Sequence, residues 1–376
     1  MTRTVAHYVD SDLLGGAEEA ALHLLAALDP ARWRPVLFHH PAPGIAPLVD
    51  RAARLGVATR AVPRPVEGHA WEQVRQFRRA LRAERPTVFH AHLSWPLACK
   101  YGVLAAWLAR VPAIVGTAQL YIDFYQVPTG QRDQRLMMRA MRRVIAVSDE
   151  VRERYRVTLQ VPAAKLVVVR NGIPIPRARR PRDPALRAEL VRGRPDFVVL
   201  TPARFHEQKG HAYLLEAAAR VPDATFVLAG EGELRPAMER RARDLGVMDR
   251  CVFLGHRSDV PELLAAADLF VLPSLFEGLP LSVLEAMAAE RPVVATAIGG
   301  TDEAVVDGVT GLLVPPRDAA ALAAAIGRLR SDPALAGRLA QTARARVEAE
   351  FSQSQFERRA IAALAGAFGP PPFWVS

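Results

Sequence analysis

The chain has 376 residues and half of them are apolar, which is enough for the cores of two domains of ordinary size. The sequence offers no run of about 20 apolar residues that would cross a membrane, and we expect no signal peptide at its start. Cys99 and Cys251 lie far apart and predict two buried thiols in a reducing compartment, so we expect a cytoplasmic protein.

The net charge of +10 is unevenly distributed. Residues 1–176 contain 24 Lys and Arg against 14 Asp and Glu, whereas residues 177–376 contain 25 of each kind. Such an excess is typical of a face for nucleic acid, a membrane surface or an anionic substrate, and it is equally typical of an arginine-rich solvated surface.

Short β-branched runs alternate with helical stretches in the first half of the chain. The expected strands are residues 4–9, 35–39, 57–62, 87–91, 113–116, 144–147 and 165–169. Segments 17–28 and 71–82 carry apolar residues at helical spacing. Continuous apolar strands that alternate with helices predict a parallel sheet covered on both faces.

The second half repeats this pattern. The expected strands are residues 197–201, 225–229, 251–254, 269–272 and 293–296, and the last helices are expected at 319–330, 333–350 and 353–368. Two such series in one chain predict the α/β class with two doubly wound, Rossmann-like domains.

The boundary between the two series is rich in proline. Residues 173–195 contain five prolines and many arginines, and proline fixes φ and removes a hydrogen-bond donor, so we expect a linker with at most one short helix. The expected division is an N-terminal domain at 1–174, a linker at 175–195, a C-terminal domain at 196–352, and a helix and tail at 353–376 that return to the N-terminal domain. Ligands of such sheets bind outside the carboxyl ends of the strands, so we expect the site in a cleft between the domains.

Two glutamates follow a buried strand in the segment at 270–288, FVLPSLFEGLPLSVLEAMA. Glu277 and Gly278 lie in a loop, a helix is expected to begin near Pro280, and Glu285 lies eight positions after Glu277 inside it. Backbone N–H groups at a helix start attract anions or hydroxyls, and glycine permits close approach of a ligand. Two carboxylates can then grip two sets of hydroxyls, as in a ribose and a hexose. The alternative is a pair of surface carboxylates, which a helix start favours in any case.

A second loop of this kind follows the strand at 197–201. Arg204 and Lys209 lie five residues apart in PARFHEQKGH, and Gly210 opens a helix. One Arg and one Lys beside a helix N-terminus can hold a diphosphate, although two solvated cations are the commoner outcome for such a pair. The nearby GEGELR at 230–235 has Arg235 in place of the third glycine of a dinucleotide fingerprint, so we do not expect an oxidoreductase.

A metal site is not expected from the sequence. His90 and His92 lie two apart on a strand, and the pleat directs both to one face. No carboxylate or further histidine at ligand spacing accompanies them, so His90 is expected to be a packed histidine and His92 to lie nearer the ligand.

These motifs occur in the order and spacing of a known family. ARFHEQKG, LAGEGEL, FLGH, the segment around Glu277 and GLLVPP follow one another between residues 197 and 316 as they do in glycosyltransferase family 4. The first half is similar to the family at Gly15–Glu18, HAH at 90–92, AVSDEVRE at 146–153 and RNGI at 170–173. The chain therefore resembles this family, whose members have the GT-B fold with two Rossmann-like domains facing across a cleft, and transfer sugars with retention. The segment from Glu277 to Glu285 resembles the E-x7-E motif of the family.

The resemblance implies a role for each residue. Arg204 and Lys209 would hold the donor diphosphate and stabilise the leaving group, and Glu277 would hold the transferred sugar. The other donor-binding residues that it implies are Gly15, Gly16, His92, Gln119, Asn171, Gly230, His256, Val260, Gly278, Leu279, Pro280, Leu281, Glu285, Gly299, Gly300 and Glu303. Glu285 would bind the ribose hydroxyls. The donor would be a UDP- or GDP-linked sugar, with no cofactor and no metal required.

One residue departs from the family pattern. Many members have a histidine in a Thr-x-His arrangement after the strand at 113–116, and this chain has Gln119 there. Glutamine can position a sugar hydroxyl but cannot act as an acid or base. The family's mechanism is usually viewed as front-face displacement, in which the leaving phosphate accepts the proton, and it tolerates this change.

Other functions remain open at this stage. A nucleotide-sugar epimerase or hydrolase could share the fold, and a catalytically inactive GT-B binding protein is supported by Gln119 alone. Nucleic-acid binding is not expected, because no recognised motif accompanies the charge. In the family the N-terminal domain recognises the acceptor, which the sequence does not identify. The basic helical segments at 71–86 and 132–143 suggest attachment to an anionic membrane, with an ordinary amphipathic helix facing the sheet as the alternative.

Overall fold

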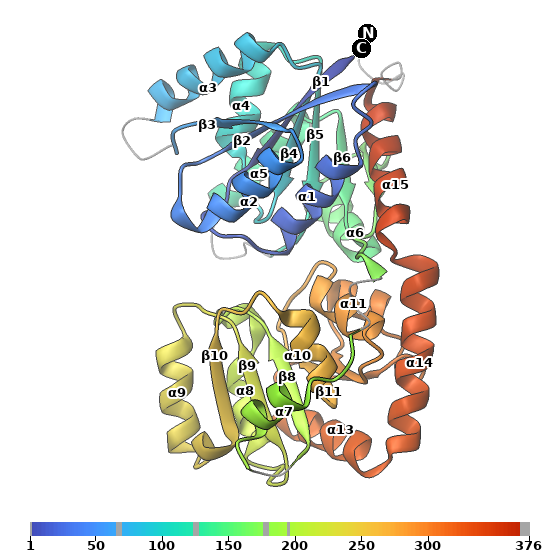
Figure 1. Cartoon of the computed structure of the whole chain (residues 1–376). Coiled ribbons are helices and arrows are strands. Elements are labelled where there is room, and N and C mark those ends of the chain that lie inside the picture. Colours follow the sequence, from blue (N-terminus) through green and yellow to red (C-terminus); the bar gives the residue numbers. More distant parts are fainter. Residues whose placement is uncertain (1, 65–69, 123–127, 176–179, 194–195, 369–376) are drawn as a thin grey trace. The chain divides into compact units, whose positions relative to one another are not determined.

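A computed structural model describes residues 2–64, 70–122, 128–175, 180–193 and 196–368. The chain forms two compact units (Figure 1). One comprises the residues up to Asn171 together with those from Ser354 onward, and the other runs from Gly172 to Gln353. The chain therefore passes from one unit to the other twice. The expected tail at 369–376 lies outside the described residues.

The first unit contains a parallel sheet of seven strands in the order β3-β2-β1-β4-β5-β6-β7. The strands are β1 (Arg3–Val9), β2 (Trp33–His39), β3 (Ala58–Ala61), β4 (Val88–Leu93), β5 (Ala113–Ala118), β6 (Arg143–Ala146) and β7 (Leu166–Val168). The helices are α1 (Gly16–Ala27), α2 (Ala46–Arg54), α3 (Ala70–Glu84), α4 (Lys100–Ala109), α5 (Pro128–Ala140), α6 (Asp149–Val157) and α15 (Gln353–Ala365). Short 3-10 turns occur at Pro43–Ile45, Ala163–Lys165 and Gly366–Phe368.

The second unit contains a parallel sheet of six strands in the order β10-β9-β8-β11-β12-β13. The strands are β8 (Val198–Pro202), β9 (Thr225–Ala229), β10 (Cys251–Gly255), β11 (Leu269–Leu272), β12 (Val293–Thr296) and β13 (Leu312–Val314). The helices are α7 (Pro184–Val191), α8 (His211–Ala218), α9 (Arg235–Asp244), α10 (Val260–Ala266), α11 (Leu281–Ala288), α12 (Gly299–Ala304), α13 (Ala319–Ser331) and α14 (Pro333–Glu350). The 3-10 turns are η4 (Glu207–Lys209) and η5 (Met248–Arg250).

Both sheets are doubly wound, as the sequence predicted, because the strand order reverses beside β1 and beside β8. β-branched runs such as Val198–Leu200 are buried on both faces, and helices of 3.6-residue periodicity cover them. Local caps fix the long helices at the end of the second unit. The Asp318 side chain accepts a hydrogen bond from the Ala321 N–H, and Asp332 caps α14 in the same way with Pro333 in its first turn.

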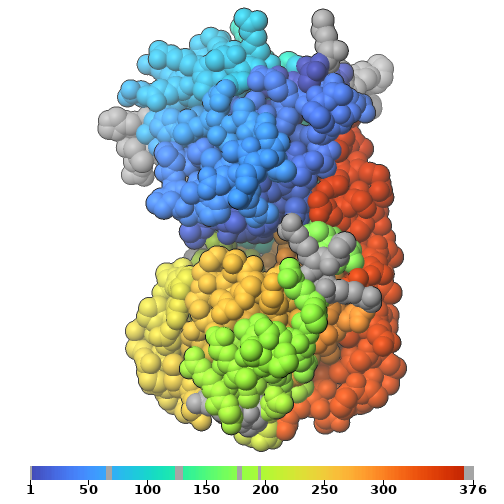
Figure 2. Space-filling model, viewed as in Figure 1, coloured from blue at the N-terminus to red at the C-terminus, as the bar shows by residue number. Residues whose placement is uncertain are grey.

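The final helix, α15, belongs to the core of the first unit. Its residues Phe356, Ala360 and Leu364 pack in one cluster with Val5 of β1 and Val88 of β4. Arg143 at the start of β6 donates a hydrogen bond to the Ala363 carbonyl at 3.2 Å. Figure 2 shows this red helix against the blue N-terminal segments.

Candidate functional site

The Glu277 loop lies at the carboxyl end of β11, where the sequence placed it. Pro280 is the N-cap of α11, so the helix begins at Leu281, and Glu285 lies inside it. Glu277 is 9% exposed. Its Oε1 lies 2.5 Å from Lys209 Nζ and accepts a hydrogen bond from Ser274 Oγ at 2.7 Å. A carboxylate this buried and this well paired is held in one orientation.

Lys209 reaches Glu277 because the loop after β8 passes close to the loop after β11. Gly210 has φ 65°, and a Cβ atom there would overlap the carbonyl oxygen of Pro273. Only glycine satisfies both the positive φ and the close approach. Arg204 lies in the same loop with an exposed side chain, which makes no ion pair or side-chain hydrogen bond with the residues that the structure describes. This loop therefore offers one paired cation and one free cation.

The two glycines of the GEGELR segment support the Arg204 loop. Cβ atoms at Gly230 and Gly232 would overlap the carbonyl oxygens of Ala203 and Phe205. The Phe205 N–H donates to the Glu231 carbonyl at 3.0 Å, so the loops after β8 and β9 are joined. The two glycines thus allow close packing between two loops. This packing explains why glycine occupies both positions, and no dinucleotide-binding role is needed.

The glycine pair after β12 packs against the Glu277 loop. A Cβ atom at Gly300 would overlap the carbonyl oxygen of Gly278, and its next neighbour would be Leu279. Arg346 of α14 donates hydrogen bonds to the carbonyl oxygens of Glu303 and Ala304, at 2.9 and 3.2 Å, at the end of α12. The structure thus brings the predicted Gly299–Glu303 segment and the Glu277 loop together.

Two further predicted residues follow β10. His256 is exposed directly after the strand, and Val260 is the first residue of α10. Arg257 between them is held by Asp259, with 2.7 Å from Nε to Oδ1. Both residues therefore lie at the carboxyl edge of the second sheet.

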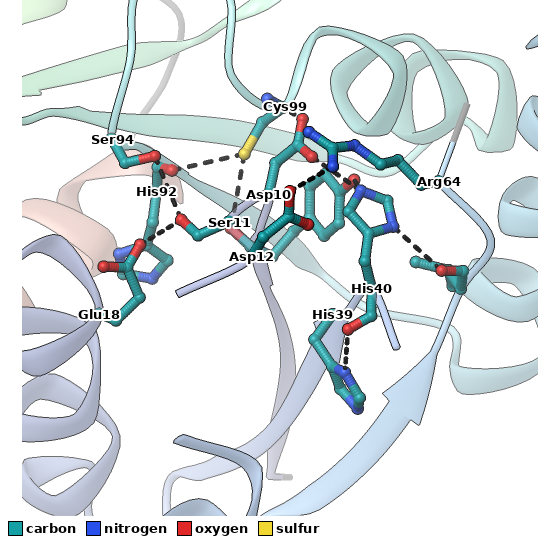
Figure 3. A network of polar contacts seen from close by, with 12 residues as sticks. Asp10, Ser11, Asp12, Glu18, His39, His40, Arg64, His92, Ser94 and Cys99 are labelled. Carbon is teal, nitrogen blue, oxygen red and sulfur yellow. Dashed lines mark hydrogen bonds and ion pairs between the residues drawn. The ribbon is translucent and has the colours of Figure 1, made fainter. Parts of the chain in front are cut away.

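In the first unit, the glycine loop begins α1. Gly15 is its N-cap, and its N–H donates to Glu18 Oε2 at 2.9 Å. Ser11 Oγ donates to the other oxygen of Glu18 and lies 3.3 Å from Ser94 Oγ in the loop after β4 (Figure 3). The buried Glu18 carboxylate thus fixes the loop that carries Gly15 and Gly16.

Asp10 joins three further loops at the same edge of the sheet (Figure 3). Its Oδ1 lies 2.7 Å from His40 Nε2 after β2, and its Oδ2 accepts the Cys99 N–H at 2.9 Å. His40 Nδ1 lies 3.1 Å from the carbonyl oxygen of Val62 after β3. Burial raises the pKa of Asp10, but the hydrogen bonds from His40 and Cys99 and the charges of His40 and Arg64 outweigh burial and lower it overall. The sequence analysis did not single out this residue.

His90 and His92 share one face of the sheet, as the pleat predicted, and a third histidine joins them. His7 pairs with His90 in the register of β1 and β4, and its Nδ1 lies 3.1 Å from His92 Nε2. The spacing argument missed His7 because it lies more than eighty residues away in the sequence. One ring nitrogen from each histidine lies within 4.8 Å of the others, but no carboxylate is part of the group.

The histidine cluster is buried, and burial favours the neutral form of each ring. Burial lowers the pKa of all three, that of His92 to about 4, and neighbouring histidines lower those of His7 and His90 further. His92 is only 3% exposed, so its ring packs inside the first unit and presents little surface to a ligand.

Gln119 and Asn171 contact each other. The Asn171 amide donates a hydrogen bond to Gln119 Oε1 at 3.1 Å. Asn171 is buried and follows β7, and Gln119 follows β5. The structure thus brings together two predicted residues that are 52 positions apart.

Two side chains that the sequence analysis did not name complete the site of the second unit. Gln208 and Ser274 are buried and both contact Glu277. Gln208 lies between the motif residues Arg204 and Lys209, and this position was the only feature of the sequence that could have pointed to it.

Comparison with known proteins identifies relatives that match most of the chain. The family model described as Glycosyltransferase Family 4 matches residues 14–177, and that described as Glycosyl transferases group 1 matches residues 196–332. The chain is 31% identical to the alpha-D-kanosaminyltransferase of Streptomyces kanamyceticus over 324 residues, which cover 78% of this chain and 83% of the relative. It is 30% identical to an Escherichia coli enzyme named UDP-Gal:alpha-D-GlcNAc-diphosphoundecaprenol alpha-1,3-galactosyltransferase, with 68% and 69% coverage.

Among solved structures, the chain is similar to Anabaena HepE in complex with UDP and glucose. The TM-score is 0.85 at 22% identity, with 96% of this chain and 99% of that chain covered. This likeness concerns the fold.

Proposed function

Because the chain belongs to glycosyltransferase family 4 and is a glycosyltransferase of the GT-B fold, we propose that it moves a sugar from a UDP- or GDP-linked donor to an acceptor hydroxyl with retention of configuration. UDP-linked sugars are the first donors to test, because HepE was solved with UDP and the Escherichia coli relative is named for UDP-Gal. The observation that carries the proposal is the loop after β8, where Lys209 contacts Glu277 and the Arg204 side chain is exposed, with no ion pair to any residue in the described part of the chain.

In this proposal the two cations take the charge of the leaving group. The bond between the anomeric carbon and the phosphate oxygen breaks, and the diphosphate gains negative charge as the acceptor oxygen bonds to the same carbon. Arg204 and Lys209 stabilise that charge, and the departing phosphate accepts the proton of the acceptor hydroxyl. No protein carboxylate needs to act as nucleophile or base, which agrees with glutamine at position 119.

Glu277 and Glu285 then bind hydroxyls. Glu277 is already held by Lys209 and Ser274, so it suits hydrogen bonding to the transferred sugar better than nucleophilic attack. Glu285 in α11 would bind the ribose. The contributions of Gly15, Gly16, His92, Gln119 and Asn171 in the first unit, and of Gly230, His256 and Val260 in the second, stay predictions of the family resemblance.

The decisive experiment is a mass-spectrometric screen of UDP- and GDP-sugars for slow hydrolysis or transfer by the full chain. Release of nucleoside diphosphate from one donor would identify base and sugar together. Product analysis separates transfer from epimerisation or hydrolysis. Failure to bind UDP and GDP would favour the catalytically inactive binding protein.

We also propose that the first unit attaches peripherally to an anionic membrane that carries the acceptor. In α3 the apolar residues Val74, Phe77 and Leu81 are buried in the unit, so this stripe is not available to lipid. The exposed residues of α3 include Arg75, Arg79 and Arg82, with Glu72 as an acidic exception. Trp71 is 63% exposed, and Trp107 of the adjoining α4 is 60% exposed. Arginines beside exposed tryptophans suit a headgroup surface. No helix in the described part of the chain is long and apolar enough to cross a membrane.

Vesicle sedimentation tests this attachment. We expect more protein to sediment with anionic than with neutral vesicles at low salt, and replacement of the three arginines with glutamine to abolish the difference. Equal recovery with both kinds of vesicle would contradict the proposal.

A further inference from the structure

The carboxylate of Glu277 has protein partners in addition to Lys209. Ser274 Oγ donates to Oε1 at 2.7 Å, and Gln208 Nε2 donates to Oε2 at 3.3 Å. Each oxygen therefore has a neutral donor from the protein in addition to the Lys209 ammonium on Oε1. Ser274 is itself anchored, because its carbonyl oxygen accepts a hydrogen bond from Thr296 Oγ1 at 2.5 Å.

Gln208 contacts three successive residues of the Glu277 loop. Its carbonyl oxygen accepts the Leu275 N–H at 2.7 Å, and its Nε2 donates to the Phe276 carbonyl at 2.9 Å as well as to Glu277. Gln208 is 5% exposed, so water has little access to these contacts. Gln208 therefore joins the loop of Lys209 to the loop of Glu277. It is not itself one of the residues proposed to contact the diphosphate or the sugar.

A diphosphate that binds Lys209 would weaken the contact of Lys209 with Glu277, because one ammonium group would then serve two anionic partners. The Glu277 carboxylate would still be held by Gln208 and Ser274, one on each oxygen. Without Gln208, a single hydrogen bond to Oε1 would leave the carboxylate free to rotate about it. A sugar is held in a reactive position only if the protein groups that bind it have a fixed orientation.

We infer that Gln208 is a positioning residue, which fixes the Glu277 carboxylate for the transferred sugar once the donor diphosphate has engaged Lys209. This inference rests on the proposed function, because it assigns the sugar to Glu277. It predicts that Gln208 affects recognition of the sugar and the rate of its transfer, with little effect on the affinity for the nucleoside diphosphate.

The test compares Gln208→Met and Gln208→Glu in the full chain. The probes are the nucleotide sugar that the wild-type chain turns over in the screen above and the matching nucleoside diphosphate. For Gln208→Met we expect kcat/KM to fall about 10- to 100-fold, as for loss of a hydrogen bond to a charged group, while the diphosphate Kd stays within about twofold. Gln341→Glu on α14, an exposed glutamine, is the matched control and should change neither quantity.

Gln208→Glu separates positioning from general damage. Its new carboxyl would face the Glu277 carboxylate, whose other oxygen is paired with the Lys209 ammonium. Near pH 8 two carboxylates would repel and activity should be lost. Two adjoining carboxyls bind one shared proton more readily than a single carboxyl does, so lowering the pH toward about 5.5 should supply an O–H donor in place of the amide. We therefore expect activity relative to wild type to recover in Gln208→Glu and to stay low in Gln208→Met.

Three outcomes would overturn the inference. They are wild-type kcat/KM in Gln208→Met, an equal loss of diphosphate and donor affinity in a folded variant, or no recovery of folded Gln208→Glu at low pH. A wild-type chain that binds no nucleoside diphosphate would instead contradict the proposed function.

Discussion

At the scale of single residues, the candidate site of the second unit contains a buried ion pair, and we propose that its cation also binds the leaving group. Lys209 Nζ lies 2.5 Å from Glu277 Oε1, with side chains 17% and 7% exposed. Breaking such a pair from one side leaves a buried charge without its partner, so replacing either Lys209 or Glu277 alone also disturbs the other.

Lys209→Ala is expected to slow transfer strongly. Removal of one fixed charge that stabilises a leaving group costs about 2.7–4 kcal/mol, or about 10²- to 10³-fold in kcat. Steady-state kinetics with the donor from the screen measure this, and Lys100→Ala at a partly exposed ion pair with Asp133 is the control. Turnover of Lys209→Ala at the wild-type rate would refute the leaving-group role.

Asp10→Asn is expected to destabilise the first unit in a pH-dependent manner. The folded-state pKa of Asp10 is lowered, so the ionised form contributes stability that is fully present above its unfolded pKa of about 3.9 and is lost as the pH falls through the folded value. We expect the variant to be less stable by about 1–3 kcal/mol at pH 7, with a gap that narrows below about pH 4. Denaturation of both proteins across this range measures the gap, and a gap independent of pH would show that the charge of Asp10 is not the cause.

At the scale of elements, the sequence predicted most strands because their β-branched runs are short and end at polar residues. β13 (Leu312–Val314) was missed, because three residues are too few for a periodicity to appear. The motif residues of the site were predicted from strand ends and from the family resemblance. Gln208 and His7 were not, because their partners lie 69 and 85 positions away and only the folded sheet brings them together. Ser274 lies three positions from Glu277, but no sequence pattern marked it.

Gly300→Ala is expected to impair donor use by moving one element against another. Its Cβ atom would overlap the Gly278 carbonyl oxygen, and a backbone atom cannot move aside cheaply. The Glu277 loop would have to shift, so we expect kcat/KM for the donor to fall at least about tenfold, because small displacements of a site are costly. Gly337→Ala on α14, where a Cβ atom meets open space, is the matched control. Equal kinetics of the two variants would show that this contact does not set the geometry of the loop.

At the scale of the whole molecule, positive charge is supplied by side chains in two different ways. The excess of +10 lies entirely within residues 1–176, where we propose that it meets a membrane, whereas Arg204 and Lys209 belong to the electrically neutral remainder. In the two proposals, therefore, different parts of the chain attract the membrane surface and stabilise the leaving group.

Chelation is expected to leave transfer unchanged, because in the proposed function Arg204 and Lys209 supply the charge that a metal ion would otherwise provide. Turnover should be the same in EDTA and after addition of Mg²⁺ or Mn²⁺, and metal analysis of the purified chain should find no stoichiometric ion. Loss of activity in EDTA with recovery on metal addition would contradict this expectation. The neutral cluster of His7, His90 and His92 would then be the first place to look.

The two passages of the chain between the units have a consequence for its synthesis. The second unit is continuous from Gly172 to Gln353, so all of it is synthesised before the last helix of the first unit leaves the ribosome. Until α15 emerges, Val5, Val88 and their neighbours lack the helix that covers them in the finished protein. The unit that is made first is therefore completed last. While its partner unit is being made, the nascent chain carries an apolar sheet face that α1 covers only in part, which is the kind of surface that chaperones bind.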